Sequence, residues 1–160
     1  MSIFQHILES YNQHYGNYIL VAIVTIFLGI ASYTDIKSLK IPNKLNLTFG
    51  IIAVLVFVIY EYSWMDISLH LIGATFGFFA LLIPAMIRMH KMGGDIKAIT
   101  VVGLFIGIEI MPFFLAISCI TALIYIVFRY FILKKIGGNM PFAPFFLLTH
   151  FILFLVNLIL

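Results

Sequence analysis

Two aspartates in matching contexts are the residues of this sequence best suited to chemistry. Asp35 and Asp95 each begin an Asp-Ile-Lys tripeptide, and each lies at the end of an apolar run. A carboxylate where a membrane helix meets water is costly and is therefore a candidate for function. Two carboxylates held close together cannot both ionise cheaply, so such a pair shares a proton near neutral pH. The ionised member can take a proton from water while the protonated member polarises a peptide carbonyl, which is aspartic-protease chemistry and needs no cofactor.

The segments that carry the two aspartates hold further candidate residues. The supporting positions are Lys37, Pro42, Asn43, Gly93, Gly94 and Lys97. Pro42 has no backbone N–H and restricts Ile41 to extended geometry, which predicts a turn rather than a continuing helix. Gly93 and Gly94 permit backbone conformations that other residues resist, so we expect a bend before Asp95.

Composition places the chain in a membrane. It is 64% hydrophobic and only 9% charged, whereas soluble domains carry about a quarter charged residues. We therefore expect an all-α polytopic membrane protein in contact with lipid. In such a protein, basic residues primarily indicate the orientation of the chain in the membrane. The net charge of +3 is therefore no sign of nucleic-acid binding, and nucleic acid is not expected as a partner. The single cysteine, Cys119, excludes an internal disulfide and a cysteine-rich zinc site, and no metal is expected.

The apolar runs predict about six membrane-spanning helices of roughly 20 residues. They cover residues 18–34, 45–62, 67–87, 96–108, 110–133 and 142–160. The fourth and fifth divide at Glu109 and Pro112; one kinked helix there would leave five spans instead. Residues 17–160 are expected to form a single transmembrane domain. Residues 1–16 form either a helix on the membrane surface or a short tail.

Charge placement favours six spans, because all nine Lys and Arg residues then fall on one side of the membrane. With five spans, the bases after residue 128 would change sides. The positive-inside rule makes the basic side cytoplasmic and places both termini on the opposite side. Of the acids, only Asp35 and Asp95 then fall on the cytoplasmic side. The two aspartates are thus expected at the same membrane face.

Three segments together resemble the type IV prepilin peptidases, membrane aspartyl proteases with a Gly-x-Gly-Asp signature. Asp35 with Ile41-Pro42-Asn43 resembles the first catalytic block, and Gly94-Asp95-Ile96-Lys97 resembles the second. Met140-Pro141-Phe142-Ala143-Pro144-Phe145 resembles the proline-bearing entry to the final helix. The resemblance implies that Asp35 and Asp95 form a catalytic dyad. It also implies cleavage of a short basic leader from a prepilin or pseudopilin substrate in the bacterial inner membrane.

The sequence departs from that family pattern in two places. Met92 stands where the signature has its first glycine, and Gly93 is expected to supply the missing flexibility one residue later. Larger members carry an insertion with paired cysteines that is linked to N-methylation of the mature pilin. This chain has only Cys119, so it resembles the short, peptidase-only branch found with Flp/Tad-type pili, and no methyltransferase activity is expected.

Other interpretations of these residues stay open. Asp35 and Asp95 could be helix-end charges neutralised by Lys37 and Lys97. They could form the proton relay of a small proton-coupled transporter, although such sites tend to lie near the bilayer midplane. The chain could also be a non-catalytic assembly subunit of a pilus or secretion machine. The glycine pairs 73/77 and 103/107 are expected to allow close helix packing, with homodimerisation as the alternative use.

Overall fold

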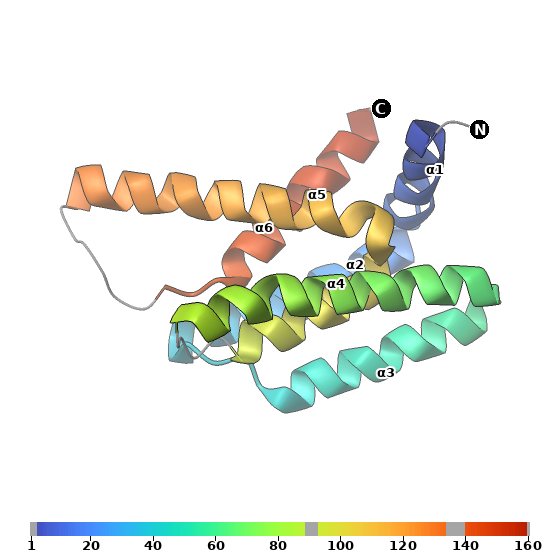
Figure 1. The fold of residues 1–160 in the computed structure, drawn as a ribbon, viewed down its shortest axis with the longest axis horizontal. Helices are drawn as coiled ribbons and strands as arrows, with labels where there is room; N and C mark the ends of the chain where they lie inside the picture. Colours follow the sequence, from blue (N-terminus) through green and yellow to red (C-terminus); the bar gives the residue numbers. More distant parts are fainter. Residues whose placement is uncertain (1–2, 89–92, 134–139, 160) are drawn as a thin grey trace.

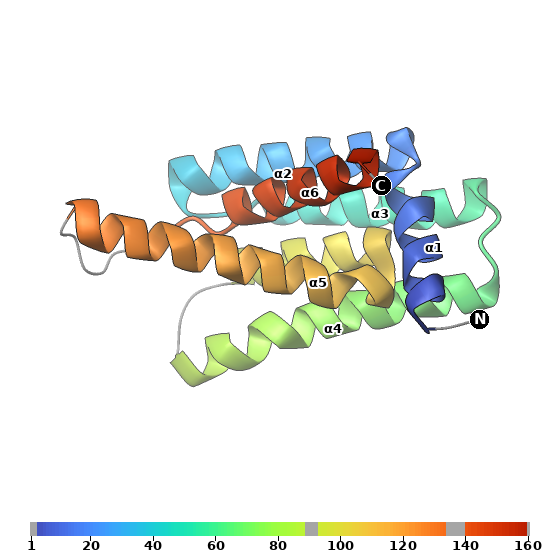
Figure 2. The same ribbon diagram turned by 90° about the horizontal axis from the view of Figure 1, so that it is seen from above.

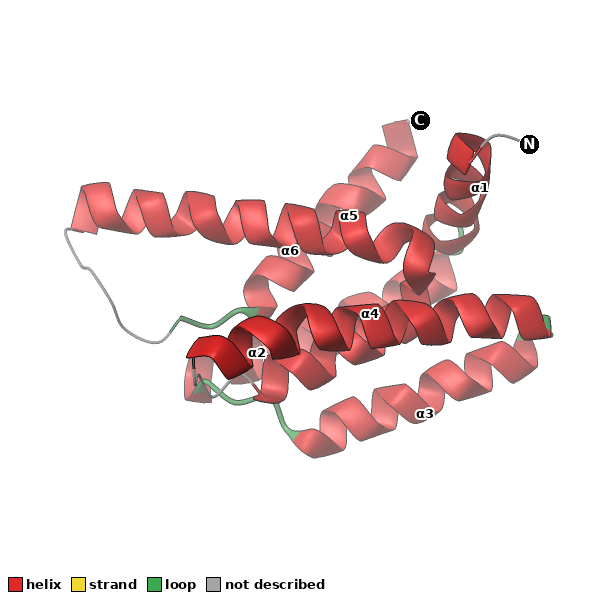
Figure 3. Cartoon of the chain, viewed as in Figure 1, coloured by secondary structure: helices red, strands yellow, loops and turns green. Residues whose placement is uncertain are grey.

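The computed structural model describes residues 3–88, 93–133 and 140–159, and every regular element within them is a helix (Figures 1 and 3). The helices are α1 (Ile3–Tyr15), α2 (Tyr18–Ser38), α3 (Asn43–Ile59), α4 (Trp64–Arg88), α5 (Gly93–Leu133) and α6 (Ala143–Ile159). The predicted all-α class is confirmed.

Length and apolarity of the helices fit a polytopic membrane protein. Within the described residues, three helices are long and apolar enough to cross a membrane: Tyr18–Ser38, Trp64–Ile87 and Gly93–Phe131. Two further apolar helices, α3 and α6, have 17 residues each. Some large apolar side chains, such as those of Trp64 and Ile59, are mostly exposed. Their exposure would be unfavourable in water but not in lipid.

Helix α5 consists of two helical segments that meet at Gly107. This glycine has φ 71° and ψ 175°, a conformation that residues with a Cβ atom adopt only at a cost. The chain reverses direction there, as the yellow and orange parts of α5 show in Figures 1 and 2. The predicted division of this region into two segments is therefore right. Its predicted position, at Glu109 and Pro112, is wrong, because the glycine takes the turn and Pro112 lies inside the second segment.

Glycines bring α4 and α5 into backbone contact. A Cβ atom placed on Gly73 would lie 2.5 Å from the carbonyl carbon of Gly107, and one on Gly103 would lie 2.6 Å from the Cα atom of Ala74. Neither position leaves room for a side chain. The expected packing role of these glycines is confirmed, as in other closely packed membrane helices.

Helix α1 packs on the bundle through its C-terminal half. Tyr11, His14 and Tyr15 are buried, and the Tyr11 hydroxyl donates a hydrogen bond to the carbonyl of Leu153 in α6. The Tyr15 hydroxyl lies 3.5 Å from Nδ1 of His150. The alternative of a short tail therefore does not hold for residues 3–15, and their contacts hold α1 against α6.

Candidate active site

The site lies where the ends of several helices gather. The C-terminal end of α2 and the N-terminal ends of α3, α5 and α6 lie toward the left in Figure 1 and again in Figure 2. The connection between α3 and α4 lies at the opposite end. Asp35 is in the last turn of α2 and Asp95 in the first turn of α5, so the fold brings the two predicted aspartates to one end of the bundle.

Asp35 is buried and held by a helix that follows it by more than a hundred residues. Its side chain is 4% exposed, and its Oδ2 atom accepts a hydrogen bond from the backbone N–H of Ala143 at 3.1 Å. Ala143 is the first residue of α6. The N-terminus of a helix presents free N–H groups and the positive end of the helix dipole. The start of α6 therefore stabilises a negative charge on Asp35, a role that the sequence did not reveal.

Asp95 is half-buried, and the negative charge of Asp35 acts on its carboxyl group. Its Oδ1 atom is buried, and no described residue donates a hydrogen bond to it. A buried carboxylate oxygen without a donor is unfavourable, and the negative charge of Asp35 adds to this cost. The two carboxyl groups thus have different surroundings within one site.

Gly94 packs against the turn that follows Asp35. A Cβ atom on Gly94 would lie 3.1 Å from the backbone nitrogen of Ile41, whereas one on Gly93 would meet no atom within 4 Å. Both glycines lie in the first turn of α5 with ordinary helical backbone angles. The expected bend at Gly93 and Gly94 is therefore wrong: Gly94 allows close approach, and the adjoining Met92 lies outside the described residues.

Pro42 and Asn43 form the start of α3, as the predicted turn requires. Pro42 is the residue before the helix, with φ −62° and ψ 133°, and its carbonyl accepts hydrogen bonds from the N–H groups of Leu45 and Asn46. The Asn43 side chain accepts a hydrogen bond from Nζ of Lys97 at 2.9 Å. That bond ties the start of α3 to the start of α5 beside Asp95.

The nearby lysines have partners other than the aspartates. Nζ of Lys37 lies 5.8 Å from the centroid of the Tyr33 ring, and Lys97 bonds Asn43. Among the described side chains, neither lysine forms an ion pair with Asp35 or Asp95. These contacts give no support to the interpretation of the two aspartates as charges neutralised by Lys37 and Lys97.

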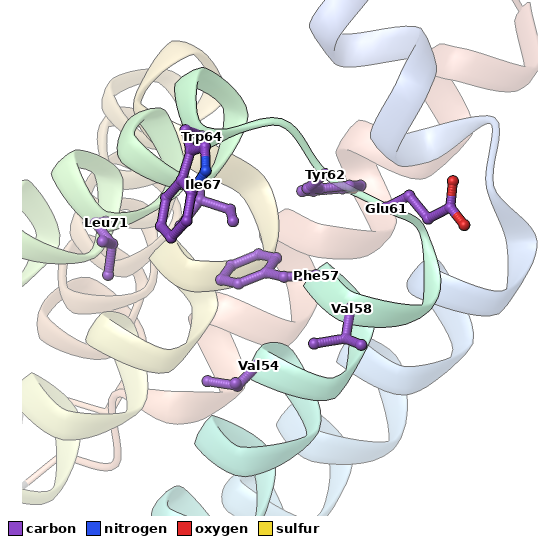
Figure 4. A pocket seen from close by; sticks show the side chains of 8 residues that line it. All are labelled: Val54, Phe57, Val58, Glu61, Tyr62, Trp64, Ile67 and Leu71. Carbon is purple, nitrogen blue, oxygen red and sulfur yellow. The ribbon is translucent and has the colours of Figure 1, made fainter.

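A hollow at the other end of the bundle offers no comparable chemistry. It lies beside the connection between α3 and α4 and has a volume of about 490 Å³. The side chains of Phe57, Trp64, Ile67 and their neighbours line it, and the carboxylate of Glu61 points away from these rings (Figure 4). Across the described ranges, no group of three or more His, Cys, Asp or Glu residues could hold a metal ion. The carboxyl pair is therefore the best candidate for chemistry in the described structure.

Comparison with known proteins assigns the chain to a family. Neither curated proteins nor solved structures give a significant match. The model of the type IV leader peptidase family matches residues 22–127, a range that contains both aspartates, the Ile41-Pro42-Asn43 turn and Lys97. That range is more than half of the 160 residues, and the chain therefore belongs to the type IV leader peptidase family.

Proposed function

We propose that this protein is a membrane-embedded aspartic endopeptidase that removes the leader from type IV prepilin-like proteins at the cytoplasmic face of the membrane. Family membership supports a leader peptidase. The observation that carries the aspartic mechanism is the placement of Asp35 in the last turn of α2 and Asp95 in the first turn of α5, at one end of the bundle.

The reaction is hydrolysis of one peptide bond by a water molecule between the two carboxyl groups. The ionised carboxylate accepts a proton from the water as its oxygen attacks the carbonyl carbon. The protonated carboxyl donates a hydrogen bond to the carbonyl oxygen, and a proton passes to the departing amide nitrogen as the bond breaks. Such a site suits a substrate with a cytoplasmic leader followed by a hydrophobic segment, because cleavage then occurs where the substrate enters the bilayer.

The protein is proposed to cross the bacterial inner membrane several times, with the dyad on the cytoplasmic side. The basic residues around the site, Lys37, Lys40, Lys44 and Lys97, favour that orientation. A single cysteine at Lys40 in a Cys119→Ser background should be labelled by an impermeant thiol reagent only in inverted vesicles. A single cysteine at Glu61 should be labelled only in right-side-out vesicles, and the opposite pattern would reverse the orientation.

The test of the activity is a cleavage assay with the purified protein in detergent and a prepilin-like substrate from the same genome. Loss of the leader is followed by gel and mass spectrometry for the wild type, Asp35→Asn, Asp95→Asn and the control Glu61→Gln. We expect cleavage by the wild type and the control, and none by either aspartate variant. Cleavage that survives in a folded aspartate variant would remove that residue from the mechanism.

A further inference from the structure

The two carboxyl groups of the proposed dyad differ in the structure, and this difference assigns their roles. We propose that Asp35 is the ionised member at rest and Asp95 the protonated member, with the Ala143 amide as the positioning group that fixes this order. The inference rests on the proposed function, because it concerns the same two carboxyl groups.

The surroundings of Asp35 favour a negative charge. A buried carboxylate is tolerated only where donors replace water, and the N–H of Ala143 supplies one at 3.1 Å. A hydrogen bond from a backbone N–H to an ionised acceptor is among the stronger kinds. Helix α6 has 17 residues, long enough for its dipole to add to the attraction.

The surroundings of Asp95 favour the neutral acid. Its buried Oδ1 atom receives no hydrogen bond from any described residue, so a negative charge there would be poorly solvated. The charge on Asp35 acts on the same group and opposes a second negative charge. A protonated Asp95 can instead donate its proton toward Asp35, which removes the repulsion.

Two helix ends oppose this order, because Asp95 lies in the first turn of α5 and Asp35 in the last turn of α2. They do not reverse it, since the N–H groups of α5 give the buried Oδ1 atom of Asp95 no hydrogen bond. The other described charges near the site do not reverse it either. Lys37, Lys40, Lys44 and Lys97 are exposed, so water screens their effect. Lys97 is bonded to Asn43, and Lys37 lies over Tyr33. The described part of α6 has His150 as its titratable group, and that ring contacts Tyr15 in α1.

The assignment gives each aspartate one step of the reaction. Asp35 is the base that takes the proton from water, and Asp95 is the acid that donates a hydrogen bond to the scissile carbonyl oxygen. Ala143 contacts Asp35 rather than the water or the peptide, so its amide acts by holding the Asp35 carboxylate charged and in position.

The protonation states can be read without a substrate. The chain has three aspartates, Asp35, Asp66 and Asp95, so aspartate labelled with ¹³C at the side-chain carboxyl gives three resonances. We expect one of them to have the chemical shift of a protonated acid at neutral pH in the wild-type protein. That resonance should be absent from Asp95→Asn, where Asp35 stays ionised. A protonated aspartate that persists in Asp95→Asn would overturn the assignment.

Thermal stability gives a second measurement. The amide introduced by Asp95→Asn resembles the neutral acid, so Tm at neutral pH should stay within about 1 °C of the wild type. Asp35→Asn removes the negative charge that lies beside the start of α6, and it should lower Tm by roughly 3–6 °C. A larger fall for Asp95→Asn than for Asp35→Asn would reverse the roles.

The positioning role of the amide is tested by Ala143→Pro, which removes the N–H at the first position of a helix, where proline is tolerated. Its control is Ala143→Gly, which keeps the N–H. In the cleavage assay, we measure kcat as a function of pH. The low-pH side of this profile, its acid limb, should move to higher pH by about one unit in Ala143→Pro, with KM unchanged. An unmoved acid limb in a folded Ala143→Pro would overturn this role. Failure of the wild type to cleave would count against the proposed function alone, because the labelling and Tm results do not depend on cleavage.

Discussion

Gly94 lies so close to Ile41 that a Cβ atom on the glycine would come within 3.1 Å of the Ile41 nitrogen and 3.3 Å of its Cβ atom. This contact joins the first turn of α5, which carries Asp95, to the turn that follows Asp35. The absence of a side chain at Gly94 thus allows the backbones of these two segments to pack closely.

Gly94→Ala should therefore reduce cleavage more than it reduces folding. The added methyl group must displace the turn at Ile41 or the start of α5, and misplacement of a catalytic group by about 1 Å can cost roughly a hundredfold in rate. Because the 3.1 Å contact requires a shift of only a few tenths of an ångström, we expect kcat to fall several-fold while the protein still folds. Gly93→Ala is the matched control, because its Cβ atom would enter open space. Equal effects of the two changes would show that the Ile41 contact is unimportant.

The bond between Lys97 and Asn43 should contribute to activity as a unit. It is exposed, so its loss should change the free energy of unfolding by less than about 1 kcal/mol. Loss of the tie between α3 and α5 should lower kcat/KM several-fold in Lys97→Met and in Asn43→Ala. A double-mutant cycle in the cleavage assay checks this, because the double variant should be no worse than either single one. Additive losses would mean that the two residues act separately, and Lys44→Met controls for loss of an exposed positive charge nearby.

Gly107→Ala should destabilise the protein. The positive φ at this glycine costs about 1–3 kcal/mol for a residue with a Cβ atom, although the nearest side-chain atoms, those of His70, leave space at 3.7 Å. The loss should therefore come from the backbone and should appear as a lower Tm in detergent. Gly29→Ala is the control, because a Cβ atom there meets nothing within 4 Å in the middle of α2. A Tm as high for Gly107→Ala as for Gly29→Ala would mean that the reversal is not strained.

The stability of the folded protein should fall in mild acid because of His14. Burial first, and then the nearby His150 and His70, lower the pKa of His14 to about 3 from its usual value of 6.5. In the unfolded chain His14 therefore becomes protonated below about pH 6.5, whereas in the folded chain it stays neutral down to about pH 3. Stability contributed by the neutral ring is present above pH 6.5 and is lost as pH falls toward 3.

Chemical unfolding at a series of pH values measures this effect. The free energy of unfolding should fall by up to about 1.4 kcal/mol per pH unit over part of this range. His14→Leu keeps an apolar side chain in the site and should reduce that slope. His6→Leu changes a histidine of the same helix and serves as the control. The same slope in His14→Leu as in the wild type would exclude His14 as its source.

The sequence was sufficient to predict the helices and the placement of the two aspartates at one end of the bundle. Long apolar runs predict helices because each must satisfy its backbone hydrogen bonds within itself in lipid, and the described elements are all helical. Alternation of the runs across a membrane places Asp35 and Asp95 at one face, and the structure has them at one end of the bundle. This much follows from hydropathy and charge, which are local properties of the chain.

The remaining features depend on contacts between backbones, which leave no side-chain signal. Any residue but proline at position 143 carries the N–H that bonds Asp35, so Ala143 looks unremarkable in sequence. Gly94 suggests flexibility, yet its observed role is close approach to Ile41. The break in α5 falls at Gly107 rather than at Pro112, and its positive φ is one that glycine adopts readily and proline cannot.

The hydrogen bond from Ala143 has a consequence for the order in which the site is completed. The family match ends at residue 127, and both aspartates are synthesised before α6. During synthesis, Asp35 has no donor from residue 143 until α6 is added. A chain shortened to the matched residues would keep both carboxyl groups but lose the amide that distinguishes them, so the asymmetry of the pair is acquired only when α6 has been added.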